Sequence, residues 1–396
     1  MNSEIRVFLQ YLFTEFSRIL LLPFDWIIPK DKNIMIYGAF SGDGYGENSR
    51  FLFEYAVKHE RKSKHYWVTA NQELYLKLKK QFPQNVVYAK SWFGMKVVLR
   101  SKIVFVSDQI TDVYYILSGR HTVINLWHGL PLRTIKYCSK QIPHLTYAFM
   151  QKLIHKNDYL IAGSESNKYL FAKCFRMDHN KILPLGLPRN DVIHTKNKDF
   201  DFSKYKYAVL YAPTLRHSAP PRFFPFKDFS LKKLEKFLMH NKILMILRGH
   251  KGNTIAKSSG LFKRKMNAGD LSDISNVLVL NHDKLKDIHE IFGNLSAVIT
   301  DYSSFYFDFL LTGKPVLFTP YDLKEYEKIH GFLYEYDAVT PGPKVYSFKE
   351  FKSELLKSLK EITYFQKERE LIAKMFFKYQ DENSSKRIMS LVKTLV

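Results

Sequence analysis

Cysteine is almost missing from this chain, which has only Cys138 and Cys174 among its 396 residues. The two residues form no CxxC pair and no cluster with histidine. A disulfide framework and a structural zinc site therefore have little support. We expect a protein of a reducing compartment.

Acidic residues are also scarce: 38 Asp and Glu face 61 Lys and Arg, which gives a formal net charge of +23. Such an excess of one sign opposes compaction and indicates an anionic partner, such as nucleic acid, an anionic membrane or a phosphorylated substrate. The acids form no cluster suited to a metal between phosphates, and we discount the nearest candidates, Asp108 and Asp112. We expect no required cofactor and leave a transient Mg²⁺ open.

The chain lacks an uninterrupted apolar run long enough to cross a bilayer, and its first residues do not have the pattern of a signal peptide. Ile5–Ile28 is mostly apolar, but Arg18, Pro23 and Asp25 interrupt it. Polar residues recur at helical spacing and form one narrow stripe. The pattern favours an amphipathic helix in the membrane interface, and we assign residues 1–30 to a membrane-association segment. The alternative is a helix packed on the protein's own core.

The remaining chain alternates short apolar strands with helical segments, which is typical of α/β units with parallel sheets. The first series predicts strands at Asn33–Tyr37, Lys64–Thr69, Asn85–Tyr88, Ile103–Val106, His121–Leu126 and Asp158–Ala162. The second predicts strands at Tyr207–Tyr211, Lys242–Leu247, Val277–Leu280, Ala297–Ile299 and Pro315–Phe318. The helices are expected at Glu47–His59, Gln72–Gln81, Ser91–Arg100, Glu165–Phe175, Leu231–Met239, Leu285–Phe292 and Phe305–Leu311. We therefore expect two doubly wound domains, residues 31–200 and 201–396.

Histidine, arginine and small hydroxyl residues follow several of the predicted strands. Because ligands of doubly wound sheets bind at the carboxyl ends of strands, these positions are candidate site residues. They lie in Trp127-His128-Gly129-Leu130-Pro131, Gly186-Leu187-Pro188-Arg189-Asn190-Asp191, Pro213-Thr214-Leu215-Arg216, Arg248-Gly249-His250 and Thr300-Asp301-Tyr302-Ser303-Ser304. Each motif alone has an ordinary structural explanation, such as a turn or a helix cap. Their joint occurrence at successive strand ends favours a site for an oxyanion or a phosphate.

The ordered motifs WHGLPLR, LGLPRND, YAPTLR, RGH and ITDYSSFYFDFLLTGKPVLF resemble the CDP-glycerol glycerophosphotransferase family of teichoic-acid and capsule synthesis. Phe40-Ser41-Gly42, together with Tyr45 and Asn48-Ser49-Arg50, resembles that family's N-terminal motif, and Asp381–Arg387 is similar to its C-terminal one. The resemblance runs from about Ile34 to Arg387. The chain departs from the family pattern at Leu130, Arg133 and Lys251.

The resemblance implies a GT-B fold, in which two Rossmann-like domains face a central cleft. It implies a donor CDP-glycerol or CDP-ribitol, a lipid-linked saccharide acceptor, release of CMP and work at the cytoplasmic face of the cell membrane. His128 is implied as the base, with His250 as a second catalytic residue. The implied donor-binding residues are Trp127, Gly129, Leu130, Pro131, Arg189, Pro213, Thr214, Arg248, Gly249, Ser303, Ser304, Asp308 and Arg387. Further candidates are Asp191, Arg216, Asp301 and Asp381.

Three alternatives stay open. A polymerase of the same family would add many units, whereas the modest length of the chain favours a priming enzyme. A GT-B glycosyltransferase would use a nucleotide sugar in the same fold. A non-catalytic basic protein would bind membrane or nucleic acid, but the lysines are spread along the chain and form no recognised nucleic-acid motif, so we expect no nucleic-acid partner.

Overall fold

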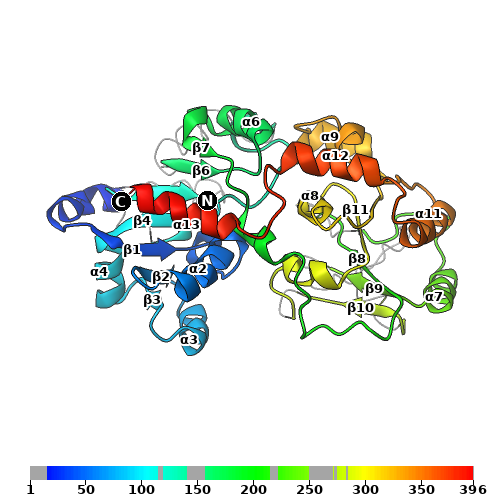
Figure 1. Cartoon of the computed structure of the whole chain (residues 1–396), viewed down its shortest axis with the longest axis horizontal. Coiled ribbons are helices and arrows are strands. Elements are labelled where there is room, and N and C mark those ends of the chain that lie inside the picture. The colour runs from blue at the N-terminus through cyan, green and yellow to red at the C-terminus, as the bar shows by residue number, and fades with distance from the viewer. Residues whose placement is uncertain are drawn as a thin grey trace, which may run out of the picture. The chain divides into compact units, whose positions relative to one another are not determined.

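The computed structural model describes residues 16–114, 119–140, 157–214, 222–248, 271, 274–281 and 284–395. The chain divides into two compact units. The first comprises residues 1–128, 142–191 and 381–396, and the second comprises residues 129–141 and 192–380. Each unit is a parallel α/β sheet with helices on both faces, so the expected α/β, GT-B class of fold is confirmed (Figure 1).

The described strands of the first unit form one parallel sheet in the order β3-β2-β1-β4-β5-β6-β7. These strands are β1 (Asp31–Tyr37), β2 (Lys64–Thr69), β3 (Val86–Tyr88), β4 (Ser101–Val106), β5 (Thr122–Asn125), β6 (Tyr159–Ile161) and β7 (Ile182–Leu183). The helices are α2 (Glu47–His59), α3 (Gln72–Gln81), α4 (Trp92–Arg100), α6 (Glu165–Phe175) and α13 (Ser384–Leu395). The order reverses between β1 and β4, where doubly wound sheets bind ligands.

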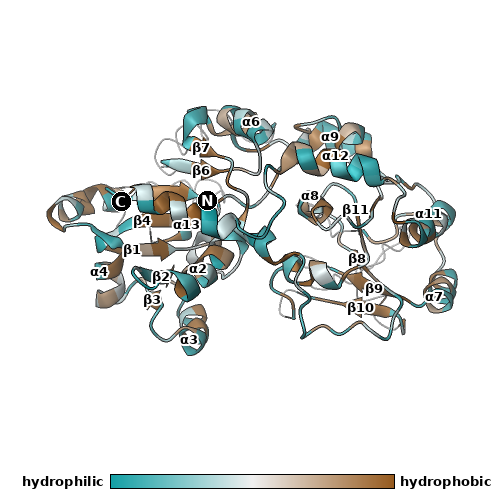
Figure 2. Cartoon of the chain, viewed as in Figure 1, coloured by the Kyte–Doolittle hydropathy of each residue, from teal (hydrophilic) through white to brown (hydrophobic). Residues whose placement is uncertain are grey.

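Alternation along the strands builds two cores in this unit, one on each face of the sheet. Met35 and Tyr37 of β1 pack with residues of α2, α3 and α13, whereas Ile34 and Ile36 pack with residues of α4. Because both faces are covered, the buried parts of the strands are mostly apolar, as in Ile34–Tyr37 of β1 and Ile103–Val106 of β4. Figure 2 shows the hydropathy of each residue along the sheet. The last helix, α13, lies beside α2 although the two are far apart in the sequence (Figure 1).

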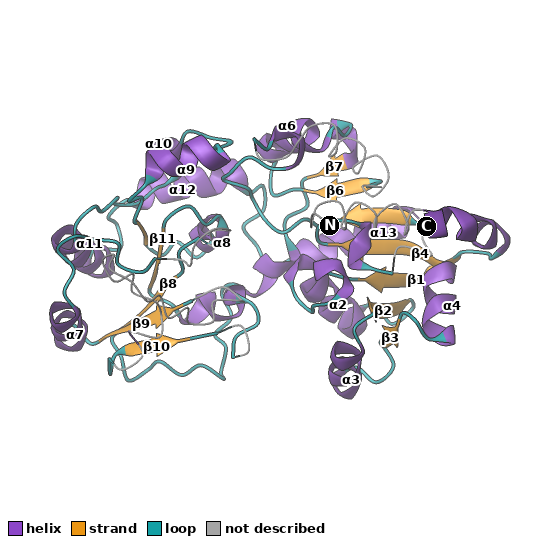
Figure 3. Ribbon diagram, turned by 180° about the vertical axis from the view of Figure 1, so that it is seen from behind, coloured by secondary structure: helices purple, strands orange, loops and turns teal. Residues whose placement is uncertain are grey.

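The described strands of the second unit form a parallel sheet in the order β10-β9-β8-β11-β12. They are β8 (Tyr207–Tyr211), β9 (Ile243–Leu247), β10 (Val277–Val279), β11 (Ala297–Thr300) and β12 (Val316–Phe318). The helices are α7 (Leu231–His240), the 3₁₀ helix η8 (Ile288–Asn294), α8 (Phe305–Leu310), α9 (Leu323–His330), α10 (Tyr336–Val339), α11 (Phe348–Lys360) and α12 (Gln366–Phe376). Residues of α8 and α12 pack on one face of the sheet, and residues of α7 and α11 pack on the other (Figure 3).

Residues 129–141, 192–200 and 381–396 belong to a different unit from the domain predicted for them. Residues 129–141 join the second unit, because Leu130 and Leu132 enter its core and the N–H of Leu333 donates to the carbonyl of Leu132 at 2.9 Å. Residues 381–396 join the first, because Ile388 and Met389 of α13 are buried in its core. Residues 129–141 and 381–396 are placed in these units by apolar contacts with segments that are distant in the sequence.

The N-terminal segment is described only from residue 16, and residues 16–27 are helical. Asp25 attaches this helix to the first unit: its Oδ2 accepts the N–H of Arg120 at 2.8 Å, and its Oδ1 pairs with Lys30 Nζ at 2.5 Å. Burial raises the pKa of Asp25, but the hydrogen bonds from Lys30 and Arg120 outweigh it, so the pKa lies below its usual value. Among the described residues, no helix is long and apolar enough to span a membrane.

Candidate active site

His128 follows β5 at the carboxyl edge of the first sheet, and its side chain is exposed. Its ring stacks on the buried ring of Trp127, with centroids 3.9 Å apart and an interplanar angle of 28°. The backbone is left-handed on both sides of it, with φ of 53° at Trp127 and 117° at Gly129. A tryptophan in this conformation costs free energy, so surrounding contacts must stabilise the turn.

Those contacts come from Asn48, Asn125 and Arg189. The amide of Asn48 donates to the carbonyl of Trp127 at 2.7 Å, and Asn125 Oδ1 accepts the N–H of Trp127 at 2.8 Å. Arg189 Nη1 donates to the carbonyl of His128 at 2.8 Å, and the N–H of Arg189 donates to Asn48 Oδ1 at 3.0 Å. Arg189 is 5% exposed and pairs with Glu47 at 3.4 Å. Arg189 therefore holds the His128 backbone in place.

The C-terminal motif, Asp381–Arg387, includes the start of α13 and belongs to the same unit. Asp191 accepts the N–H groups of Ser384 and Ser385 at 2.8 Å each, so it caps the start of this helix. Burial outweighs these hydrogen bonds and raises the pKa of Asp191. Gly186 permits the approach, because its φ is +87° and a Cβ there would lie 2.5 Å from Ser384 Oγ.

Arg387 of α13 pairs with Asp381 through one nitrogen, Nη1, which lies 2.8 and 2.9 Å from the two carboxylate oxygens. Its Nε donates to the carbonyl of Leu185 at 2.8 Å. Burial raises the pKa of Asp381, but the bonds from Arg387 outweigh it and the pKa is lowered. The predicted Arg387 and Asp381 thus contact each other.

Thr214 and Asp301 meet at the switch point of the second sheet, where β8 and β11 end side by side. The N–H and Oγ1 of Thr214 donate to Asp301 Oδ1 at 2.7 and 2.6 Å. The hydroxyl of Tyr336 donates to the carbonyl of Asp301 at 2.8 Å. Asp301 is buried, and its hydrogen bonds with Thr214 hold the ends of β8 and β11 together.

Ser303 and Ser304 follow Asp301 and are half-buried, and the Ser304 side chain makes no capping hydrogen bond to α8. Arg248 follows β9, the neighbour of β8, and donates to the carbonyls of Leu280 and Lys286 at 3.2 and 3.4 Å. Burial lowers the pKa of Arg248. Thr214, Arg248 and Ser303 thus follow three adjacent strands, β8, β9 and β11.

Other predicted residues have different surroundings. Leu130 and Pro131 are buried in the second unit, where Leu130 joins the core. Asp308 is fully buried and contacts His289. Arg216, Gly249 and His250 lie outside the described residues. Asn48 and Glu47 were not predicted as site residues, although the resemblance had included Asn48 in a motif.

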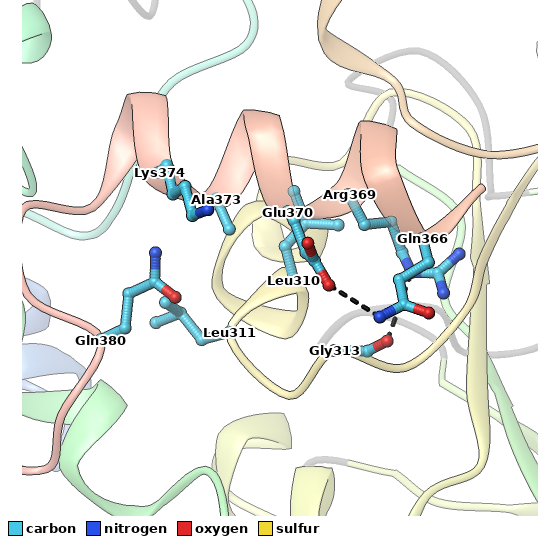
Figure 4. A pocket seen from close by; sticks show the side chains of 9 residues that line it. All are labelled: Leu310, Leu311, Gly313, Gln366, Arg369, Glu370, Ala373, Lys374 and Gln380. Carbon is cyan, nitrogen blue, oxygen red and sulfur yellow. Dashed lines mark hydrogen bonds between the residues drawn. The ribbon is translucent and has the colours of Figure 1, made fainter. Parts of the chain in front are cut away.

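Within the described part of the chain, no three His, Cys, Asp or Glu side chains are grouped to hold a metal ion. A pocket of about 120 Å³ lies between the end of α8 and α12 in the second unit (Figure 4). None of the predicted site residues lines it. Arg369 at its wall is buried and donates to the carbonyls of Gly313, Ile362 and Tyr364, which is a structural role.

Solved structures share this fold. The wall teichoic acid polymerase TagF is 21% identical with a TM-score of 0.74, over 99% of this chain and 97% of that one. The UDP complex of S. aureus MnaA is 12% identical with a TM-score of 0.55, over 91% of this chain and 96% of that one. At these identities both likenesses show the fold alone.

Curated relatives are similar over most of the chain. A teichoic acid glycerol-phosphate transferase of Staphylococcus aureus is 25% identical over 91% of this chain and 93% of its own length. A teichoic acid glycerol-phosphate primase of Bacillus subtilis is 26% identical over 72% of this chain and 73% of its own length. The sequence model of the CDP-glycerol:poly(glycerophosphate) glycerophosphotransferase family matches residues 20–394, and the chain belongs to this family of transferases.

Proposed function

We propose that this protein transfers glycerol phosphate from CDP-glycerol to a lipid-linked saccharide acceptor of teichoic-acid or capsule synthesis. The observation that carries the proposal is His128, an exposed histidine at a strand end whose backbone is held by Arg189. Histidine can accept a proton near neutral pH. A rigid backbone with an exposed ring suits a base that must meet an acceptor hydroxyl.

In the proposed reaction, His128 removes the proton of an acceptor hydroxyl, and the oxygen attacks the phosphorus that bears glycerol. The bond between that phosphorus and the bridging oxygen breaks, and CMP leaves with the electron pair. Phosphoryl transfer depends mainly on positioning and charge neutralisation. Arg248 and the hydroxyls of Ser303 and Ser304 are the proposed donor contacts, together with Gly249 and His250.

The relatives support a donor of this class. A TagF structure was obtained after a soak with CDPG. Relatives include glycerol-phosphate primases and a ribitol-phosphate primase of Bacillus spizizenii, so CDP-ribitol is the alternative donor. We favour a priming role and keep the polymerase as the alternative, because the relatives include primases as well as a B. spizizenii polymerase that is matched over 81% of its own length.

We also propose peripheral attachment to the inner leaflet through the helix at residues 16–27. Its large exposed apolar side chains are Phe16, Ile19, Leu20, Phe24, Trp26 and Ile27, with Trp26 at 70% and Ile27 at 77% exposure. At 100° per residue they fall within an arc of about 160°. Asp25 is buried on the other side. The helix thus turns its polar side to the protein and its apolar side outward, which suits an interface with lipid.

Product analysis by mass spectrometry tests the proposal. The purified protein is incubated with a lipid-linked saccharide acceptor and with CDP-glycerol, CDP-ribitol or nucleotide sugars in turn. We expect addition of one glycerol phosphate and release of CMP. Extension by many units would establish the polymerase, and transfer of a sugar would establish a glycosyltransferase.

A further inference from the structure

The core of the second unit contains a histidine whose two ring nitrogens both face carboxylates. His289 Nδ1 lies 2.6 Å from Asp287 Oδ1, and its Nε2 lies 3.2 Å from Asp308 Oδ2. His289 is 3% exposed and Asp308 is 0% exposed. A neutral imidazole has one donor and one acceptor nitrogen, so it would direct one lone pair at a carboxylate oxygen. The geometry therefore favours an imidazolium that donates to both.

This arrangement connects the start of η8 with α8. Asp287 caps η8, and its Oδ1 also accepts the N–H of His289 at 3.0 Å. Asp308 belongs to α8, which begins directly after Ser303 and Ser304. The bridge through His289 thus fixes the start of η8 against the helix that follows the proposed donor motif.

Arg248 contacts the loop that leads into this bridge. Its Nη2 donates to the carbonyl of Lys286, the residue before Asp287. Burial lowers the pKa of Arg248, whereas the negative charges of Asp287 and Glu290 raise it. The guanidinium of Arg248 is thus attracted toward Asp287 and Glu290, although it donates hydrogen bonds to main-chain carbonyls. The position of Arg248 therefore depends on where Asp287 is held.

We propose that His289 and Asp308 are positioning residues that hold Asp287 and its loop, so that Arg248 stays oriented toward the diphosphate of the donor. The inference rests on the proposed function, because it takes Arg248 as a donor contact. In this proposal Asp308 does not contact the donor; it acts by holding His289, which agrees with its complete burial.

Donor affinity in a double-mutant cycle tests the coupling. Replacing His289 alone would take one hydrogen-bond donor from the buried Asp308 carboxylate, so the variant combines His289→Gln with Asp308→Asn. With Arg248 present, we expect the affinity for CDP-glycerol in calorimetry to fall about tenfold. In the Arg248→Gln background, the same pair of changes should alter affinity little. His240→Gln, an exposed histidine of the same unit, is the matched control.

An equal loss in both backgrounds, or no loss, would overturn the positioning role while Arg248 remained a donor contact. An Arg248→Gln variant with unchanged donor affinity would instead defeat the proposed donor site, and the inference with it.

Nuclear magnetic resonance of ¹⁵N-histidine-labelled protein reports the protonation of histidine rings without a substitution at His289. We expect one histidine to be doubly protonated at pH 8 and to be shifted by Asp287→Asn. A neutral ring at that position at pH 8 contradicts the bridge.

Discussion

Arg189 and His128 are joined by a hydrogen bond of 2.8 Å between the guanidinium and the main-chain carbonyl. The bond is made to the main chain and does not involve the imidazole. It also stabilises a turn in which Trp127 has a left-handed backbone. We infer that this contact fixes the position of the proposed base at the edge of the first sheet.

Arg189→Ala should therefore lower turnover by about 10–100-fold, because His128 loses its fixed position. The free energy of unfolding should fall by about 2–3 kcal/mol, since buried acceptors lose a charged donor. Steady-state kinetics and urea unfolding measure the two effects. Arg61→Ala, an exposed arginine of the same unit, is the control. Turnover within twofold of the wild type would exclude this role.

Thr214→Val should weaken the junction between β8 and β11. The change removes a hydroxyl that donates to Asp301 at 2.6 Å and nearly preserves the side-chain volume. We expect a loss of about 1.5–3 kcal/mol in unfolding free energy, the usual range for a bond to a charged group. Thr214→Ser should keep most of this stability, and the exposed Thr363→Val is the control. Equal stability of the Val and Ser variants would argue against the bond.

The stability of the first unit should depend on pH through Asp112. Its carboxylate accepts N–H groups of Ser41, Ser107 and Asp108, yet burial raises the pKa of Asp112 to about 6. The folded-state pKa lies above the unfolded value of about 3.9, so protonation favours the folded protein. The contribution is complete below about pH 4 and is lost as the pH rises through about 6.

Asp112→Asn cannot titrate at this position. Relative to that variant, the wild type should lose about 3 kcal/mol of unfolding free energy between pH 4 and pH 8. Urea unfolding of both proteins across this range measures the difference. A difference that stays constant with pH would contradict the titration of Asp112.

The helix at residues 16–27 should be required for binding to lipid. Replacing Phe24, Trp26 and Ile27 together by Ser removes three exposed apolar side chains. We expect binding to anionic vesicles to fall at least about 100-fold, because each such side chain contributes about 1.5–3 kcal/mol on burial. Vesicle flotation is the measurement, and Leu371→Ser, with 66% exposure in the second unit, is the control. Undiminished flotation of the triple variant would defeat the anchor hypothesis.

Local patterns predicted most of the elements. The bounds of α2, β2, α3, α6 and β8 agree with the expected ranges. These segments carry clear apolar periodicity, and caps such as Asn71 and Ser164 mark where their helices begin. The segment predicted as a helix at Leu285–Phe292 instead starts a 3₁₀ helix at Ile288, because Asp287 caps it. Helices α9 and α10 were not predicted from the sequence.

The site was predicted less completely, because its contacts join distant segments. The strand-end rule selected Thr214 and Asp301 separately, and the structure brings them into contact where β8 and β11 end. It did not indicate that Asn48 reaches the Trp127 carbonyl, or that His289 meets Asp308. Asn48 is an ordinary polar residue at the start of a helix, and no local pattern distinguishes it. The motif containing it was the only available signal.

Replacement of His128 tests the central claim most directly. Transfer from CDP-glycerol to a lipid-linked acceptor is measured for the wild type, for His128→Ala and for the exposed His179→Ala as control. If His128 is the base, His128→Ala should lower the rate by about 10²–10⁴. Its affinity for CDP-glycerol should stay within about tenfold of the wild type, and the control should retain full activity. Near-normal turnover by a folded His128→Ala protein would contradict the account.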